Sequence, residues 1–206
     1  MLIEQFIVGV LQTNAWLLTC GSTGESVLID PGGLSDRMLA TVRKTKLKAV
    51  LLTHGHFDHI AGAEEIAATT GARIMIHDLD APLLTDPYLN GSLMFGEPMR
   101  LGHATETVAD GGSIAFGECS LKVLHTPGHT PGGVAYFDGS NNVFGGDTLF
   151  RLSVGRWDLP GGDYETLMRS LRTFLALDDH VTVHPGHGDI TTVGFERRLN
   201  QFLAGR

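Results

Sequence analysis

The stretch Thr53-His54-Gly55-His56-Phe57-Asp58-His59 follows directly on the apolar run 49–52, which reads Ala-Val-Leu-Leu. A short apolar run that ends in turn residues predicts a buried strand. His54 and His56 are two residues apart in extended chain, so both imidazoles can face one side and bind one metal ion. Asp58 and His59 come where the chain turns toward the next helix, and their directions differ. The loop therefore predicts ligands for two neighbouring metal ions.

Four further short apolar runs end in loops that carry potential ligands or carboxylates. These runs are 26–29 before Asp30, 121–124 before His129, 142–144 before Asp147 and 181–183 before His187. Binding groups usually sit on loops that a rigid sheet holds in place. If the strand ends face one way, these loops form a single site along one edge of the sheets.

Helical patterns lie between the predicted strands. Ser35 can cap a helix with an apolar face, and 64–70 reads as a second helix. Asp163 can cap a third helix over 164–177, which has a strong apolar stripe, and 194–203 forms a short last helix. The segment 78–107 has weak periodicity and scattered prolines and glycines, so we expect an irregular segment that covers the site.

The composition is that of an ordinary globular protein. The 206 residues are 42% apolar and 18% charged, and we expect one domain over residues 1–206. The formal charge of −8 comes without a basic stripe, which excludes nucleic acid as an expected partner. Cys20 and Cys119 have no ligand spacing, which favours a reducing, cytoplasmic setting. No apolar run reaches the roughly 18 residues that a membrane span needs, so we expect no membrane association.

The candidate ligands form a set suited to two divalent ions. His54, His56, His59, His129 and His187 offer nitrogen, and Asp58 and Asp147 offer oxygen. Nitrogen and oxygen donors suit zinc, iron and manganese alike. Two such ions carry four positive charges, of which two aspartates and a hydroxide cancel three. The residual positive charge favours an anionic substrate or transition state.

The order of four motifs, HxHxDH, TPGHTPGG, GGDTLF and HPGHG, resembles the metallo-β-lactamase fold superfamily, and within it the short bacterial glyoxalase II-like hydrolases. The resemblance implies an α/β fold built as a four-layer αββα sandwich, with two divalent metal ions, zinc first among them, at one edge. It also implies roles for single residues. They are His54, His56 and His129 on the first metal, Asp58, His59 and His187 on the second, Asp147 as the bridge, and Asp30 as a support beside the ligands.

The resemblance implies hydrolysis of a small-molecule thioester such as S-lactoylglutathione, with a metal-bridging hydroxide as nucleophile and Asp58 and Asp147 as the catalytic carboxylates. Arg156 falls near a family position that contacts glutathione, and Trp157 can wall the pocket. Alternatively, Arg156 simply pairs with Asp158. The chain lacks the C-terminal extension of full-length glyoxalase II and a tyrosine after Arg156, and both supply glutathione contacts there.

Other functions share these ligands. A persulfide dioxygenase would hold one iron through His54, His129 and Asp147, and a lactone hydrolase would use the same nucleophile. A purely structural metal site is a further alternative, although such sites are typically closed by four ligands. True β-lactamase activity is disfavoured because Asp147 stands where many such enzymes have cysteine. Metal content and assays must separate these possibilities, because the ligand patterns overlap.

Overall fold

The computed structural model describes residues 1–102 and 104–203, and the strands of its first half pair in the order in which they occur in the chain. The first three strands are antiparallel, and each later strand runs parallel to its neighbour. The strands of this first sheet are β1 (Leu2–Val8), β2 (Thr13–Thr19), β3 (Glu25–Ile29), β4 (Lys46–Leu51), β5 (Arg73–His77) and β6 (Glu106–Val108).

A second six-stranded sheet follows, with the order β14-β13-β10-β9-β8-β7. Its pairs are antiparallel except for β10 with β13, which run parallel. Its strands are β7 (Ser113–Phe116), β8 (Cys119–His125), β9 (Val134–Phe137), β10 (Asn142–Gly146), β13 (Thr182–Pro185) and β14 (Thr191–Thr192), and a small separate pair is made by β11 (Leu149–Phe150) and β12 (Ser153–Val154).

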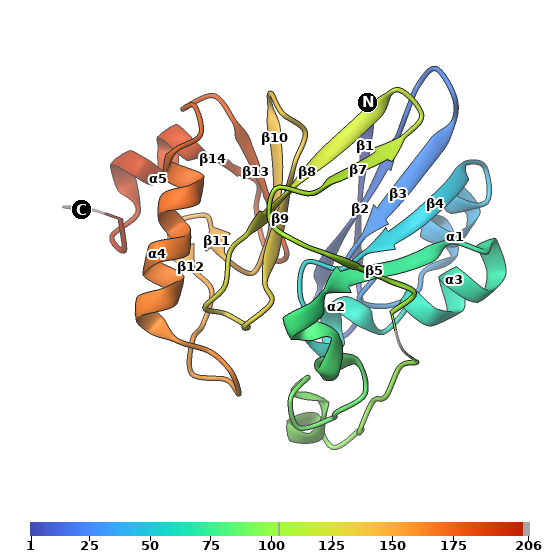
Figure 1. Ribbon diagram of the computed structural model, residues 1–206, viewed down its shortest axis with the longest axis horizontal. Coiled ribbons are helices and arrows are strands. Elements are labelled where there is room, and N and C mark those ends of the chain that lie inside the picture. Colours follow the sequence, from blue (N-terminus) through green and yellow to red (C-terminus); the bar gives the residue numbers. More distant parts are fainter. Residues whose placement is uncertain (103, 204–206) are drawn as a thin grey trace.

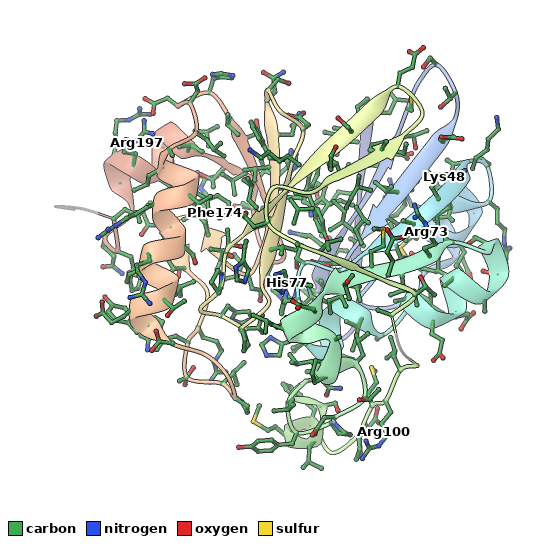
Figure 2. All side chains as sticks on the ribbon, in the orientation of Figure 1. Lys48, Arg73, His77, Arg100, Phe174 and Arg197 are labelled. Carbon is green, nitrogen blue, oxygen red and sulfur yellow. The ribbon has the colours of Figure 1, made fainter. Side chains whose placement is uncertain are left out.

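Helices cover the outer face of each sheet (Figure 1). The helices α1 (Asp36–Val42) and α3 (Ala63–Thr70) cover the first sheet, and α4 (Tyr164–Leu175) and α5 (Val193–Leu199) cover the second. Phe174, on the inner side of α4, is fully buried against the second sheet (Figure 2). The predicted four-layer αββα sandwich is therefore confirmed.

Alternate residues of the central strands serve two different cores. Leu17 and Val50 face α1 and α3, whereas Trp16 and Leu51 face the second sheet. A strand that is buried on both faces needs apolar side chains at nearly every position, which is why these strands read as continuous apolar runs. The same geometry leaves the strand ends, rather than the strand faces, free to carry polar groups.

The predicted helix starts are confirmed more closely than the helix ends. The side chains of Ser35 and Asp163 accept hydrogen bonds from the backbone N–H of Met38 and Thr166. However, α4 ends at Leu175 rather than at residue 177, and α5 spans Val193–Leu199 rather than 194–203. Helix ends fray and are set by tertiary packing, so sequence patterns locate them less well.

The irregular segment predicted over 78–107 contains two 3₁₀ helices, η1 (Asp78–Leu84) and η2 (Ser92–Phe95), and it runs into β6. Phe95 of η2 packs on Phe57, with ring centroids 4.8 Å apart. Because Phe57 follows the paired histidines directly, the segment lies beside the predicted site. In the described residues no helix is long and apolar enough to cross a membrane. A single domain over residues 1–206 stays a prediction.

Candidate metal centre

The predicted ligands come from loops that follow four different strands. His54 and His56 follow β4, His129 follows β8, Asp147 follows β10, and His187 follows β13. The short helix α2 (Phe57–Ile60) begins inside the first loop and carries Asp58 and His59. The structure brings all seven side chains together at one edge of the two sheets.

His54, His56 and His129 form the first group of potential ligands, with donor atoms within 4.8 Å of one another. His56 Nδ1 lies 2.9 Å from His129 Nε2. His54 Nε2 is buried and has no hydrogen-bond partner. A buried ring nitrogen without a partner is costly, and converging lone pairs repel, so a cation among them resolves both problems.

Asp58, His59 and His187 form the second group. His187 Nε2 lies 3.1 Å from Asp58 Oδ2 and 3.2 Å from His59 Nε2. His59 Nε2 is 3.4 Å from the same Asp58 oxygen. Three donor atoms therefore face one small volume, as the sequence predicts for the second metal.

The Asp147 carboxylate lies between the two groups. Its Oδ1 is 3.4 Å from His59 Nε2, and its Oδ2 is 3.6 Å from both His129 Nε2 and His187 Nε2. The buried Oδ1 has no hydrogen-bond partner. Gly186 packs so closely that a Cβ at that position would collide with this oxygen. The placement fits a carboxylate that bridges two ions.

Asp30 is placed to orient ligands rather than to bind metal. Its oxygens accept from Thr53 N at 2.7 Å, from Thr53 Oγ1 at 2.6 Å and from His59 Nδ1 at 3.0 Å. Although Asp30 lies close enough to His54 and His59 to form a third group, its oxygens are already used. Its φ of 48° lies in the left-handed region, a strained conformation that often marks functional sites.

Other ring nitrogens of the ligands have fixed partners too. His129 Nδ1 donates to the Arg156 carbonyl at 2.7 Å, and His187 Nδ1 to the Leu11 carbonyl at 3.1 Å. Because Thr53 Oγ1 donates to Asp30, it accepts from His54 Nδ1 at 3.0 Å. In each ring the proton sits on Nδ1, which leaves the Nε2 lone pair facing the centre.

The electrostatics differ between the two groups of ligands. Burial would lower the pKa of His59, but the carboxylates of Asp147, Asp58 and Asp30 outweigh it and raise that pKa well above its usual value, whereas the pKa values of His54 and His56 shift the other way. Burial lowers the pKa of His56 to about 3 and that of His54 well below its usual value. Burial also acts on Asp147 and would raise its pKa, but the nearby His59 more than offsets this, and the net shift is downward. Neutral imidazoles beside an anionic carboxylate are the states in which these groups bind divalent metals.

Asp80 is a functional residue that the sequence interpretation missed. It is fully buried in η1 and accepts from Gly55 N at 3.0 Å, Thr130 Oγ1 at 2.7 Å and Gly132 N at 2.6 Å. These bonds join the loop of His54 and His56 to the loop of His129. Asp80 lies in a segment without periodicity, and no motif marks it.

A cavity of about 370 Å³ borders His56, Asp58, His129, Asp147 and His187. Arg156 lines this cavity, and its guanidinium pairs with Asp158 through two bonds of 2.7 and 2.9 Å. The described lining does not include Trp157, whose ring packs on Tyr164 and Phe202. The structure thus gives Arg156 access to a substrate but gives no support to Trp157 as a wall.

The αββα sandwich and the cluster of histidines and aspartates at one edge of its sheets are those of a metal-binding α/β protein. The chain belongs to the metallo-beta-lactamase superfamily, whose family model matches residues 8–187. Members of this superfamily are largely metal-dependent hydrolases, and this chain has the corresponding metal-binding cluster.

Two relatives align over nearly the whole chain. An uncharacterised protein of Mycobacterium tuberculosis is 41% identical over 100% of this chain and 99% of its own length. The hydroxyacylglutathione hydrolase GloC of Haemophilus influenzae is 34% identical over 98% of both chains.

Three solved structures share the fold. BLEG-1, described as a B3 metallo-beta-lactamase, has a TM-score of 0.93 at 36% identity, covering 99% of this chain and all of that one. TTHA1623, in a di-iron-bound form, has a TM-score of 0.84 at 39% identity, and the match covers 97% of this chain and 100% of that one. ETHE1 from Myxococcus xanthus has a TM-score of 0.80 at 28% identity, and the match covers 100% of this chain and 86% of that one. These neighbours show the fold and leave the choice of metal open.

Proposed function

We propose that the protein is a binuclear metal-dependent hydrolase that cleaves thioesters, with S-lactoylglutathione as the reference substrate. The observation that carries the proposal is the buried Asp147 carboxylate between two groups of three ligands, beside a cavity that a small molecule can enter. The full-length similarity to GloC supports the thioester class. Zinc is the metal we propose first.

Two divalent ions, when bound, would acidify water and polarise the substrate carbonyl. One ion would be held by His54, His56 and His129, and the other by Asp58, His59 and His187. Asp147 would hold both ions. Asp58 borders the cavity, and its Oδ2 accepts a weak hydrogen bond from Thr13 Oγ1 at 3.4 Å. This carboxylate would be the group that takes up a proton there. A thiolate leaves without much protonation, because the pKa of a simple thiol is about 8.5.

Arg156 is the residue we propose for substrate anchoring. Its side chain borders the cavity while Asp158 holds it in place. Because the ion pair is exposed, an acceptor oxygen of the substrate can compete with Asp158 for the guanidinium.

The test measures bound metal and hydrolysis of S-lactoylglutathione in the wild type and in Asp147→Ala. We expect about two metal ions per chain in the wild type, and a loss of activity of at least about a thousandfold with reduced metal content in the variant. Asp178→Ala, at an exposed aspartate after α4, is the control and should keep both properties. Full activity and metal content in Asp147→Ala would exclude this mechanism.

A second candidate is a persulfide dioxygenase with one iron on His54, His129 and Asp147. The similarity to ETHE1 and to the di-iron-bound TTHA1623 fits this candidate equally well. One iron per chain, with oxygen uptake on glutathione persulfide and no thioester hydrolysis, would favour it. The similarity to BLEG-1 adds a β-lactam to the assays, and a lactone belongs there too, since the same centre can attack any activated carbonyl.

We also propose a cytoplasmic location, since Cys20 and Cys119 are free thiols and a reducing compartment keeps them so. The proposed partner is a small molecule.

A further inference from the structure

Apart from the ligands, the cavity beside the metal centre is lined mainly by apolar side chains. They come from the β1–β2 loop, from α2, from η2 and from the segment that runs from β11 to residue 159: Leu11, Phe57, Met94, Phe95, Phe150, Val154 and Leu159. Met94 is 62% exposed and Phe95 is 54% exposed, although they lie next to each other at the cavity edge. Exposed apolar side chains that continue the lining of a cavity are typical of a binding groove.

Besides the ligands, the polar side chains in the described lining are Asn90, Ser153 and Arg156, and Ser153 Oγ makes one long hydrogen bond of 3.5 Å to the Val154 carbonyl. Asn90 borders the cavity, but its side-chain amide is committed to the Leu83 and Met99 carbonyls and to Ser92 N. Arg156 is the one cationic side chain in the described lining, and Asp158 already pairs with it. The cavity lining does not include the exposed side chains of Lys48, Arg73, Arg100 and Arg197, which Figure 2 labels.

This balance suits some thioesters much better than others. Glutathione carries two carboxylates and an ammonium group, and each needs a polar partner when it leaves water. One paired arginine cannot serve both carboxylates. A hydrocarbon chain needs no such partner, and it gains free energy from contact with Phe57, Met94 and Phe95.

We propose that the natural substrate is a thioester with an apolar acyl chain of several carbons, and that glutathione is a poor thiol for this site. The inference rests on the proposed thioester hydrolysis and names its substrate class. The acyl chain of the substrate would lie along the wall formed by Phe57, Met94 and Phe95, with the thioester carbonyl at the metal ligands.

The experiment measures kcat/KM of the metal-loaded protein for N-acetylcysteamine thioesters of acetate, butanoate, hexanoate and octanoate. We expect kcat/KM to rise about three- to fourfold for each added methylene until the cavity is filled, which is the factor for burying one such group. The gain should appear mainly in KM, because binding to a wall acts on ground state and transition state alike. S-lactoylglutathione should be slower than the hexanoyl thioester.

Substitutions in the wall of Phe57, Met94 and Phe95 test where the acyl chain lies. Phe95→Ser should lower the ratio of octanoyl to acetyl kcat/KM by about tenfold, and Phe95→Leu should restore most of it. Leu79→Ser is the matched control, because Leu79 is 51% exposed in the same cover segment but does not line the cavity. Its ratio should equal that of the wild type.

Two results would overturn the inference while leaving thioester hydrolysis intact. One is a kcat/KM that does not change with chain length, and the other is S-lactoylglutathione as a better substrate than every member of the series. A loaded protein that hydrolyses no thioester at all would instead overturn the proposed function, and this inference with it.

Discussion

At the scale of single residues, the structure shows the hydrogen bonds through which Asp30 supports the ligands. The carboxylate accepts three hydrogen bonds, two from Thr53 and one from His59, and is 1% exposed. Thr53 in turn accepts from His54. Asp30 therefore sets the direction of one ligand of each group, His59 directly and His54 through Thr53.

Asp30→Asn should weaken metal binding about 10- to 100-fold, the usual effect of losing a partner that orients a ligand. An amide has one acceptor oxygen and cannot serve three donors, so a buried donor loses its bond at a cost of about 1–3 kcal/mol. Titration of the metal-free variant with zinc against a chromophoric chelator measures the change. Asp36→Asn, at an exposed position in α1, is the control. Unchanged zinc affinity in Asp30→Asn would contradict the orienting role.

At the scale of elements, Asp80 connects η1 to two loops that carry ligands. Its three donors are Gly55, Thr130 and Gly132, and burial raises the pKa of the carboxyl although these bonds act against the shift. The loops of His54 and His129 are thus held by a residue outside both.

Asp80→Ala should lower the free energy of unfolding by about 3–5 kcal/mol, because it leaves buried donors unsatisfied. It should also reduce thioester hydrolysis, since small shifts in ligand position weaken catalysis. Urea unfolding and kinetics measure the two effects. Asp78→Ala, an exposed change in the same 3₁₀ helix, should cost much less. Equal effects of the two substitutions would show that Asp80 does not hold the loops.

The N-cap of α1 offers a prediction that separates stability from function. Ser35 Oγ accepts from Met38 N at 3.3 Å, on the face of the first sheet away from the second one. Ser35→Ala should cost about 1 kcal/mol of stability, the usual effect of removing a serine cap. Metal content and kcat should not change. The midpoint of thermal unfolding and the metal content measure this, and a loss of metal would mean that α1 contributes to the site.

At the scale of the whole molecule, the metal centre lies where the strand ends of both sheets meet. Three apolar core clusters extend between the sheets and under the covering helices, so we expect the described layers to pack without metal. The ions would then add to the stability of a fold that forms without them.

Removal of metal by a chelator should lower the midpoint of thermal unfolding by about 10 °C. At a metal concentration about 1,000 times the Kd, binding contributes about 4 kcal/mol, and each kcal/mol shifts the midpoint of a chain of this size by about 2–4 °C. The far-ultraviolet circular dichroism should stay native, and zinc should restore the midpoint. His54→Ala should respond less to the chelator. Complete unfolding without metal would instead indicate a structural metal site.

Much of the fold could be predicted because local rules decide it. The run 49–52 is buried on both faces and shows this by its composition, and Ser35 and Asp163 mark helix starts because capping is a short-range hydrogen bond. The ends of α4 and α5 could not be predicted as well, because packing decides where a helix stops.

The sequence by itself determined the types of the candidate ligands and their spacing, since four of them lie within residues 54–59 and the other three follow recognisable strands. Only the tertiary structure decided which groups meet. Asp80 reaches two distant loops, Trp157 turns to Tyr164 and Phe202 instead of the cavity, and Phe95 joins the wall beside Phe57. The physical reason is that such contacts join residues far apart in the chain, and no local pattern in the sequence reports on them.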